Sequence, residues 1–246
     1  MSDALRGEWA KAWSGRAWIM LLSFAVYMSL LTSFGYASEG RDGITAGTTD
    51  ISAVTDDVVR AWMMTFLLSS LFGAIAVSRE YTSGSISRSV LLTGRRRLFV
   101  AKATVSAAVG ALFGLVAIAL AVASAWGLLG MYGLRPEWTT ETTLIALGVF
   151  VCNVLAAPWG AFLGWIIRHQ IGSVIAVMAM TLLVDPGLQR LVPGLSKYLL
   201  TIAMSAVYRD VNHDLLSPQA ALLVIAGWLA AAGFAGYRLL RTRDIT

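Results

Sequence analysis

Six long apolar stretches, separated by short polar segments, constrain this chain more than any other feature of its sequence. About 20 apolar residues, coiled as a helix, are enough to cross the hydrocarbon core of a bilayer. The chain is only 13% charged, whereas a soluble domain carries about 25% charged residues. We therefore predict an all-α membrane protein, a single transmembrane domain over residues 1–246 with six spans. The spans are Ala17–Tyr36, Val58–Val77, Ala103–Gly130, Thr143–Ile167, Ile171–Val184 and Pro218–Tyr237.

The basic residues predict which side of the membrane each end faces. If both termini are cytoplasmic, the cytoplasmic segments hold 13 Lys and Arg residues and the outer segments hold six. Short cytoplasmic loops are enriched in Lys and Arg. We expect a multi-pass protein of the plasma membrane with both termini in the cytoplasm. This distribution accounts for the net charge of +5, so the charge does not indicate nucleic-acid binding.

Two segments are expected to lie at the membrane without crossing it. Residues 1–16 predict an interfacial elbow helix, because Leu5, Trp9 and Trp13 share one face and Glu8 lies three residues before Lys11. This helix anchors the topology, and a contact with a cytoplasmic partner is a second role. Residues 185–217 predict an outer re-entrant segment.

The evidence for this re-entrant segment is a pair of chain breaks followed by a short apolar run. Asp185-Pro186-Gly187 and Pro193-Gly194 are expected to break the chain, and the apolar run Leu195–Tyr208 is too short for a span. Ser217-Pro218 is a helix start. The nearby Asn212-His213-Asp214 lacks the partner ligands of a metal site, so we expect no bound metal. The fifth span, Ile171–Val184, is also short, and we expect it to borrow residues around Arg168–Gln170.

The cytoplasmic loop of residues 78–102 carries more than orientation requires. Arg79 and Glu80 lie at a span end, and Gly84 then breaks the helix. Ile86, Val90 and Leu91 predict one short apolar face, which Gly94 ends. Such a helix, held at the membrane by the basic residues that follow it, suits the docking of another protein. The alternative is that these basic residues only enforce topology.

This loop resembles the coupling region of type-2 ABC exporter permeases, particularly six-span members from actinobacteria. The family's Glu-Tyr, Gly-Thr/Ser-Ile, arginine turn and lysine at the start of span three correspond to Glu80-Tyr81, Gly84-Ser85-Ile86, Arg95–Arg97 and Lys102. The two ends, Glu8-Trp9-Ala10-Lys11 and Arg241-Thr242-Arg243-Asp244, are also similar to those of the family. The chain departs from the family at Thr93-Gly94, where many members carry a proline.

The resemblance implies the membrane subunit of an ATP-driven exporter of a hydrophobic or amphipathic compound, such as a drug, antibiotic, peptide or lipid-like molecule. It implies two copies of an ABC ATP-binding subunit, which hold ATP and Mg, and a second six-span permease, identical or related. This chain has no phosphate-binding loop, so we expect it to bind no cofactor and not to be an enzyme. The implied coupling residues are Arg79, Glu80, Tyr81, Gly84, Ser85, Ile86, Val90, Arg95, Arg96, Arg97 and Lys102; those of the elbow helix are Glu8, Trp9, Lys11 and Trp13.

The span interiors leave other functions open. An ion-coupled carrier usually needs charged residues near the middle of its spans, and we find none there. A non-transporting scaffold or sensor remains an alternative. Tyr27, Asn153 and Pro158 are candidates for a substrate path, although an interhelical hydrogen bond also explains Asn153. The pairs Gly110/Gly114 and Gly160/Gly164 permit close helix contact, within the chain or at a dimer face.

Overall fold

A computed structural model describes residues 1–211 and 214–244, and within this part of the chain the only regular structure is helical. Six helices are long and apolar enough to cross a membrane, which confirms the predicted number of candidate spans. They are α2 (Ala17–Ala46), α3–η1–α4 (Ile51–Thr82), α6 (Arg95–Met131), α7 (Thr140–Ile167), α8–η2–α9 (Gln170–Leu191) and α12 (Pro218–Thr242). The short helices are α1 (Ser2–Trp13), α5 (Ser85–Thr93), α10 (Pro193–Ser196) and α11 (Leu200–Val207).

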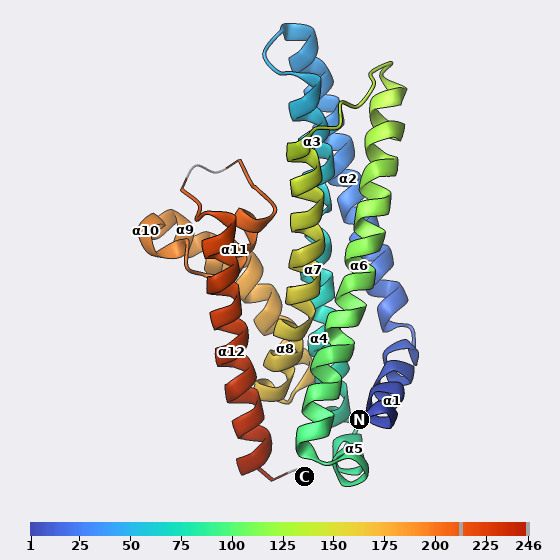
Figure 1. Ribbon diagram of the computed structural model, residues 1–246, viewed down its shortest axis with the longest axis vertical. Helices are drawn as coiled ribbons and strands as arrows, with labels where there is room; N and C mark the ends of the chain where they lie inside the picture. Colours follow the sequence, from blue (N-terminus) through green and yellow to red (C-terminus); the bar gives the residue numbers. More distant parts are fainter. Residues whose placement is uncertain (212–213, 245–246) are drawn as a thin grey trace.

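The long helices run side by side, and both ends of the chain lie at the same end of the bundle (Figure 1). An even number of crossings gives this arrangement. We call the end with both termini the inner end, following the predicted topology, and the opposite end the outer end. Helices α1 and α5 lie at the inner end (Figure 1).

Helices α4 and α7 form the centre of the bundle, and glycines allow their backbones to touch. A Cβ atom added to Gly73 would lie 1.9 Å from the carbonyl oxygen of Ala157, and one added to Gly160 would lie 1.8 Å from that of Ser70. Gly110 packs in the same way against the Asn153 carbonyl on α7. The predicted glycine pairs therefore serve packing within the chain, which leaves Gly110 and Gly160 unavailable to a dimer face.

The helices extend further than the apolar stretches predict. Helix α2 continues to Ala46, so the polar outer segment after Tyr36 is mostly helical. The fifth span starts at Gln170, directly before its predicted first residue. Most of its extra length lies beyond Val184, whereas we expected it around Arg168–Gln170. Apolar length sets only the minimum of a span, because polar residues also form helix outside the hydrocarbon core.

The expected break at Asp185-Pro186-Gly187 is wrong. These residues begin α9, which follows directly from the wider π-helical turn at Met180–Val184. Pro186 has no N–H to donate to a carbonyl of this preceding turn, and the wider turn accommodates it within the helix. The chain breaks instead at Val192, with φ −139° and ψ 72°, just before Pro193 as predicted.

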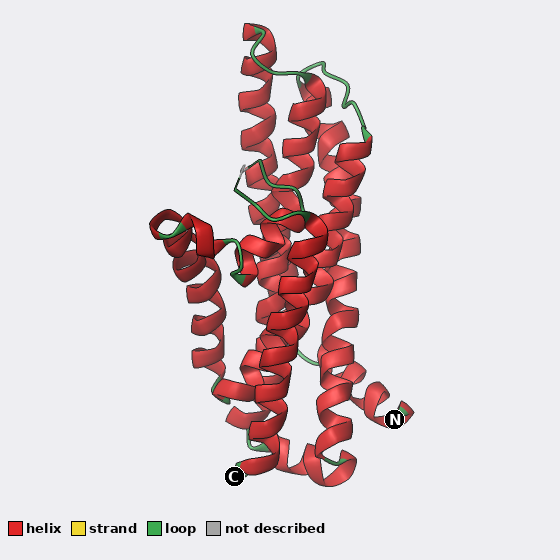
Figure 2. Cartoon of the chain, turned by 60° about the vertical axis from the view of Figure 1, so that its left-hand side comes forward, coloured by secondary structure: helices red, strands yellow, loops and turns green. Residues whose placement is uncertain are grey.

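The outer segment after α9 is built from short helices. Helices α9 and α10 turn away from the bundle, whereas α11 lies against α12 and α7 (Figures 1 and 2). Gly148 of α7 allows the close approach, because an added Cβ would lie 2.2 Å from the Val207 carbonyl oxygen. Ser217 caps α12 as predicted, with its hydroxyl accepting from the Ala220 N–H. Whether this segment re-enters a membrane stays a prediction, and Asn212 and His213 lie outside the described residues.

Candidate functional site

Two glycines define the short helix α5 at the inner end. Gly84, before its first residue, has φ +69°, and Gly94, after its last, has φ +81°. Residues with a side chain rarely adopt these backbone angles, whereas glycine adopts them readily. The chain therefore leaves α4, forms α5 and enters α6 through two sharp turns, as the sequence predicts for Gly84 and Gly94.

A buried ion cluster lies beneath α5. Lys102 Nζ on α6 donates to Glu8 Oε2 of α1 and to Glu80 Oε1 of α4, at 2.7 Å in both cases. Lys102, Glu8 and Glu80 are each less than 10% exposed. With Lys11, these residues form what we call the inner ion cluster, which has two positive and two negative side chains. Charges this deeply buried are stable only when they are paired.

Lys11 extends the inner ion cluster to α5. Its Nζ donates to Glu8 Oε1 at 2.7 Å, to Glu80 Oε1 at 3.1 Å and to the Ser89 hydroxyl of α5 at 3.0 Å. Partial burial alone would lower the pKa of the Lys11 ammonium. The hydrogen bonds and negative charges of Glu8 and Glu80 outweigh this effect and raise the pKa above its ordinary value.

Arg79 fixes the end of α1. Its guanidinium donates to the carbonyl oxygens of Lys11, at 2.5 Å, and Ser14, at 3.2 Å. Carbonyls in the last turn of a helix have no partners within the helix and carry a partial negative charge. Arg79 therefore adds a cationic donor at this negative end and ties α1 to the inner end of α4.

The underside of α5 is apolar. Ile86 is buried with Val77, Leu98, Trp165 and other apolar residues, and Val90 packs against the same cluster. The prediction that Leu91 shares this face is wrong, because Leu91 is 86% exposed. Leu91 lies five positions after Ile86 in the helix, which turns its side chain well away from the buried face. Leu91 and the 79% exposed Leu92 instead lie at the surface of the inner end, where Leu92 also lines the groove between α1 and α5.

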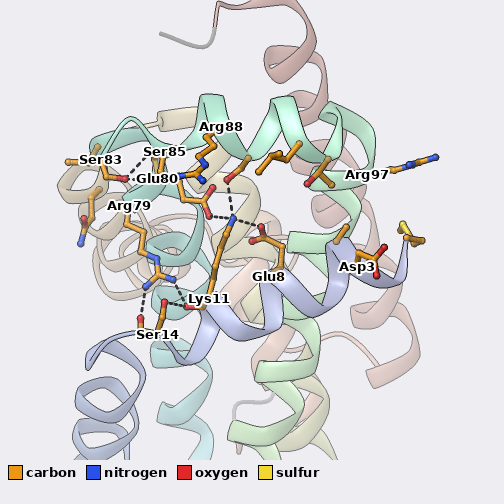
Figure 3. A pocket seen from close by; sticks show the side chains of 18 residues that line it. Asp3, Glu8, Lys11, Ser14, Arg79, Glu80, Ser83, Ser85, Arg88 and Arg97 are labelled. Atoms are coloured by element: carbon orange, nitrogen blue, oxygen red, sulfur yellow. Dashed lines mark hydrogen bonds and ion pairs between the residues drawn. The ribbon is translucent and has the colours of Figure 1, made fainter.

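An open groove of about 1050 Å³ lies between α1, α5 and the inner end of α4 (Figure 3). Its walls combine three side chains of the inner ion cluster with hydroxyls and further charges. Besides Glu8, Lys11 and Glu80, the polar lining includes Asp3, Ser14, Arg79, Ser83, Ser85, Arg88, Ser89 and Arg97. We call it the α1–α5 groove.

The structure brings together most of the residues that the resemblance implied for coupling. Glu80, Arg79 and Ser85 line the α1–α5 groove, and Lys102 lies beneath it. The remaining members lie around this core. Tyr81, Ile86 and Val90 belong to the apolar underside, and Arg95 and Arg96 are exposed at the start of α6, where Arg97 reaches the groove.

The residues predicted for the elbow helix, α1, lie in two different environments. Glu8 and Lys11 enter the inner ion cluster. Trp13 packs edge-to-face between Trp9, at 5.3 Å, and Trp18 of α2, at 5.1 Å between ring centroids. The Trp residues thus hold α1 to the start of α2, while the charged residues hold it to α4 and α6.

The candidate substrate-path residues do not line one space. Tyr27 is 60% exposed on α2, whereas Asn153 is fully buried. The Asn153 amide donates to the Thr65 hydroxyl of α4 at 2.8 Å, which is the interhelical hydrogen bond considered as its alternative role. Pro158 lies further along α7 and is half-buried. Within residues 1–211 and 214–244, no three His, Cys, Asp or Glu side chains gather as metal ligands.

Several residues of the inner end are not evident from the sequence. Ser89 accepts from Lys11, Phe99 joins an aromatic cluster, and Arg168 contacts both the end of α12 and Tyr81. The sequence indicates only that Arg168 lies between two spans. The preference of short cytoplasmic loops for basic residues explains that position without any further role.

Lys11 offers a graded test of the inner ion cluster. We expect Lys11→Met to lower the thermal unfolding temperature less than Lys102→Met, because the Lys11 side chain is 40% exposed and that of Lys102 is 4% exposed. Because the folded pKa of Lys11 is raised, its contribution is complete below the ordinary value of 10.5. It is lost as the pH rises through the folded pKa. Unfolding of both variants at neutral pH checks the ranking, and equal losses would contradict it.

No protein-family model matches this chain, and the comparison with curated proteins finds no match.

Proposed function

We propose that this chain is the membrane-spanning permease subunit of an ATP-driven ABC exporter. The α1–α5 groove is the observation that carries the proposal. A short helix is held at the inner end over a buried ion cluster, it exposes two leucines, and it borders a charged groove. Together with the resemblance of residues 78–102 to the coupling region of these permeases, this geometry supports a docking surface for an ATP-hydrolysing subunit.

In this proposal, α5 passes motion from the ATP-hydrolysing subunit to the spans. Lys11 joins α5 to α1 through Ser89, and Lys102 joins α1 to α4 and α6 through Glu8 and Glu80. Ile86 adds an apolar contact with the inner ends of the long helices. A displacement of α5 therefore reaches α4 and α6 through directional hydrogen bonds and a buried apolar contact.

The remaining parts of the proposal follow from the same family resemblance. Two ATP-binding subunits hold ATP and Mg, and a second six-span permease, identical or related, completes the path. The inner end faces the cytoplasm, and the membrane is the plasma membrane. The cargo is a hydrophobic or amphipathic compound, which agrees with the absence of Asp, Glu, Lys and Arg near the middle of the spans.

The proposal predicts that charge on the exposed tip of α5 prevents assembly. The chain purified from its native membrane in mild detergent should carry an ATP-hydrolysing subunit, and Leu91→Glu with Leu92→Glu should lose it. Both leucines are exposed, so the variant should still fold. Arg243→Glu places a new acid on exposed chain at the C-terminal end, outside the groove, and is the matched control.

Two results would count against this proposal. One is a chain that purifies without any ATP-hydrolysing partner, which would favour a scaffold, a sensor or an ion-coupled carrier. The other is a partner that stays bound to the double leucine variant as well as to the control, which would move the docking surface away from α5.

A further inference from the structure

Arg168 contacts three separate parts of the chain at the inner end. It ends α7 in a left-handed conformation with φ +60°, which is uncommon for a residue with a side chain. Its guanidinium donates to the carbonyl oxygens of Leu239, at 2.7 Å, and Asp244, at 3.1 Å. The guanidinium carbon also lies 5.1 Å from the centroid of the Tyr81 ring. One side chain therefore touches the end of α12 and the residue next to Glu80.

An aromatic cluster joins the same helices around Arg168. The Tyr81 ring packs edge-to-face on Trp165 with centroids 5.8 Å apart, and Phe99 lies 5.7 Å from Trp165 and 5.4 Å from Tyr237. These rings come from α4, α6, α7 and α12. Aromatic rings at these centroid distances attract one another beyond the effect of the area that they bury.

A second arginine holds the C-terminal end of α12 from another direction. Arg95, at the start of α6, donates to the Arg241 carbonyl oxygen at 2.8 Å. The last carbonyls of a helix lack partners and form its negative pole, so cationic donors stabilise them. The planar Arg168 guanidinium binds two carbonyl oxygens at once, one in the last turn of α12 and one just beyond the helix, which a lysine ammonium does not do with fixed geometry.

We propose that Arg168 is a positioning residue that fixes Tyr81, and with it the start of the α4–α5 turn, to the C-terminal end of α12. The last span thereby joins the coupling apparatus, although it lies far from residues 78–102 in the sequence. That this link serves coupling rests on the proposed function. The positional link itself is a property of the single chain.

The test measures the distance between α5 and α12 by double electron–electron resonance in the purified chain. Spin labels are placed at Leu92 and Arg238, both exposed, after Cys152→Ala removes the free cysteine. We expect one narrow distance distribution in the otherwise unchanged chain and its loss in Arg168→Gln. Arg168→Lys keeps the charge but not the fork, so it should give an intermediate width. Arg243→Gln is the matched control and should leave the distribution narrow.

A second label pair separates a local role from general stabilisation. Labels at Leu147 on α7 and Leu223 on α12 report on the bundle away from Arg168, and both positions are exposed. Their distribution should not change in Arg168→Gln. An unchanged Leu92–Arg238 distance in Arg168→Gln would overturn the proposal. Broadening of both pairs would also overturn it, because Arg168 would then stabilise the whole bundle.

A functional measurement keeps this inference distinct from the proposed function. In a complex that retains its ATP-hydrolysing subunit, Arg168→Gln should reduce the stimulation of ATP hydrolysis by the permease without releasing the subunit. Unchanged stimulation would contradict the positioning role. If no such subunit is found, the proposed function fails while the distance measurements still decide whether Arg168 links α12 to Tyr81.

Discussion

Replacing Lys102 with methionine should destabilise the protein by about 3–5 kcal/mol, the usual cost of removing one partner from a buried ion pair. Lys102 is 4% exposed and bridges the carboxylates of Glu8 and Glu80. Without it, these two buried acids share only Lys11. Methionine keeps an apolar chain of similar length, so the loss reports on charge and not on volume. Thermal unfolding in detergent measures the effect.

Two further variants make the Lys102 result interpretable. Arg96→Met removes a positive charge from an exposed position of the same helix and should change stability little. Combining Lys102→Met with Glu80→Gln removes one of the two carboxylate charges that then share Lys11, and it should recover much of the lost stability. A Lys102→Met protein as stable as Arg96→Met would show that the inner ion cluster does not hold the helices together.

Replacing Gly160 with alanine should destabilise the bundle, against the intrinsic preference of a helix for alanine. Alanine is favoured over glycine in a helix interior by about 1 kcal/mol. At Gly160, however, the added Cβ would lie 1.8 Å from the Ser70 carbonyl oxygen of α4. Because the obstacle is backbone, α4 and α7 must move apart, and overpacking of this kind costs about 1–3 kcal/mol or more. We expect a lower unfolding temperature and a smaller yield of folded protein.

Gly227→Ala is the control for this substitution. Gly227 lies within α12, and a Cβ built there meets nothing within 4 Å. The same chemical change should therefore be neutral or stabilising at Gly227. Equal effects at the two positions would mean that the close contact between α4 and α7 does not limit the packing of the bundle.

The sequence predicts the number of candidate spans well because apolar length is a local property. It predicts their ends poorly. Helix α2 continues through Glu39, Arg41 and Asp42, since polar residues form helix wherever water can solvate them. Pro186 was expected to break the chain, but the preceding π-helical turn accommodates it. That turn belongs to a helix whose course depends on contacts such as the one between Asp185 and the Thr201 N–H, which periodicity does not reveal.

The site was predictable where local backbone chemistry determines it. Gly84 and Gly94 mark the ends of α5, and most of the residues implied by the family resemblance gather around this helix. The pairing of charges was not predictable, because Glu8 and Lys102 are 94 residues apart. Sequence spacing gave only the local pair of Glu8 and Lys11. The role of Arg168 likewise depends on α12 returning to the inner end.

Site-specific photocrosslinking at Leu92 can identify the partner of α5 in the native membrane. A photoreactive residue at this exposed position of α5, activated in the native membrane, captures whatever occupies the α1–α5 groove, and mass spectrometry identifies it. We predict capture of a subunit that binds and hydrolyses ATP, and no capture of that subunit from Leu182, which is exposed on the side of the fifth span. Capture from Leu92 of lipid alone, or of proteins that do not bind ATP, would contradict the account.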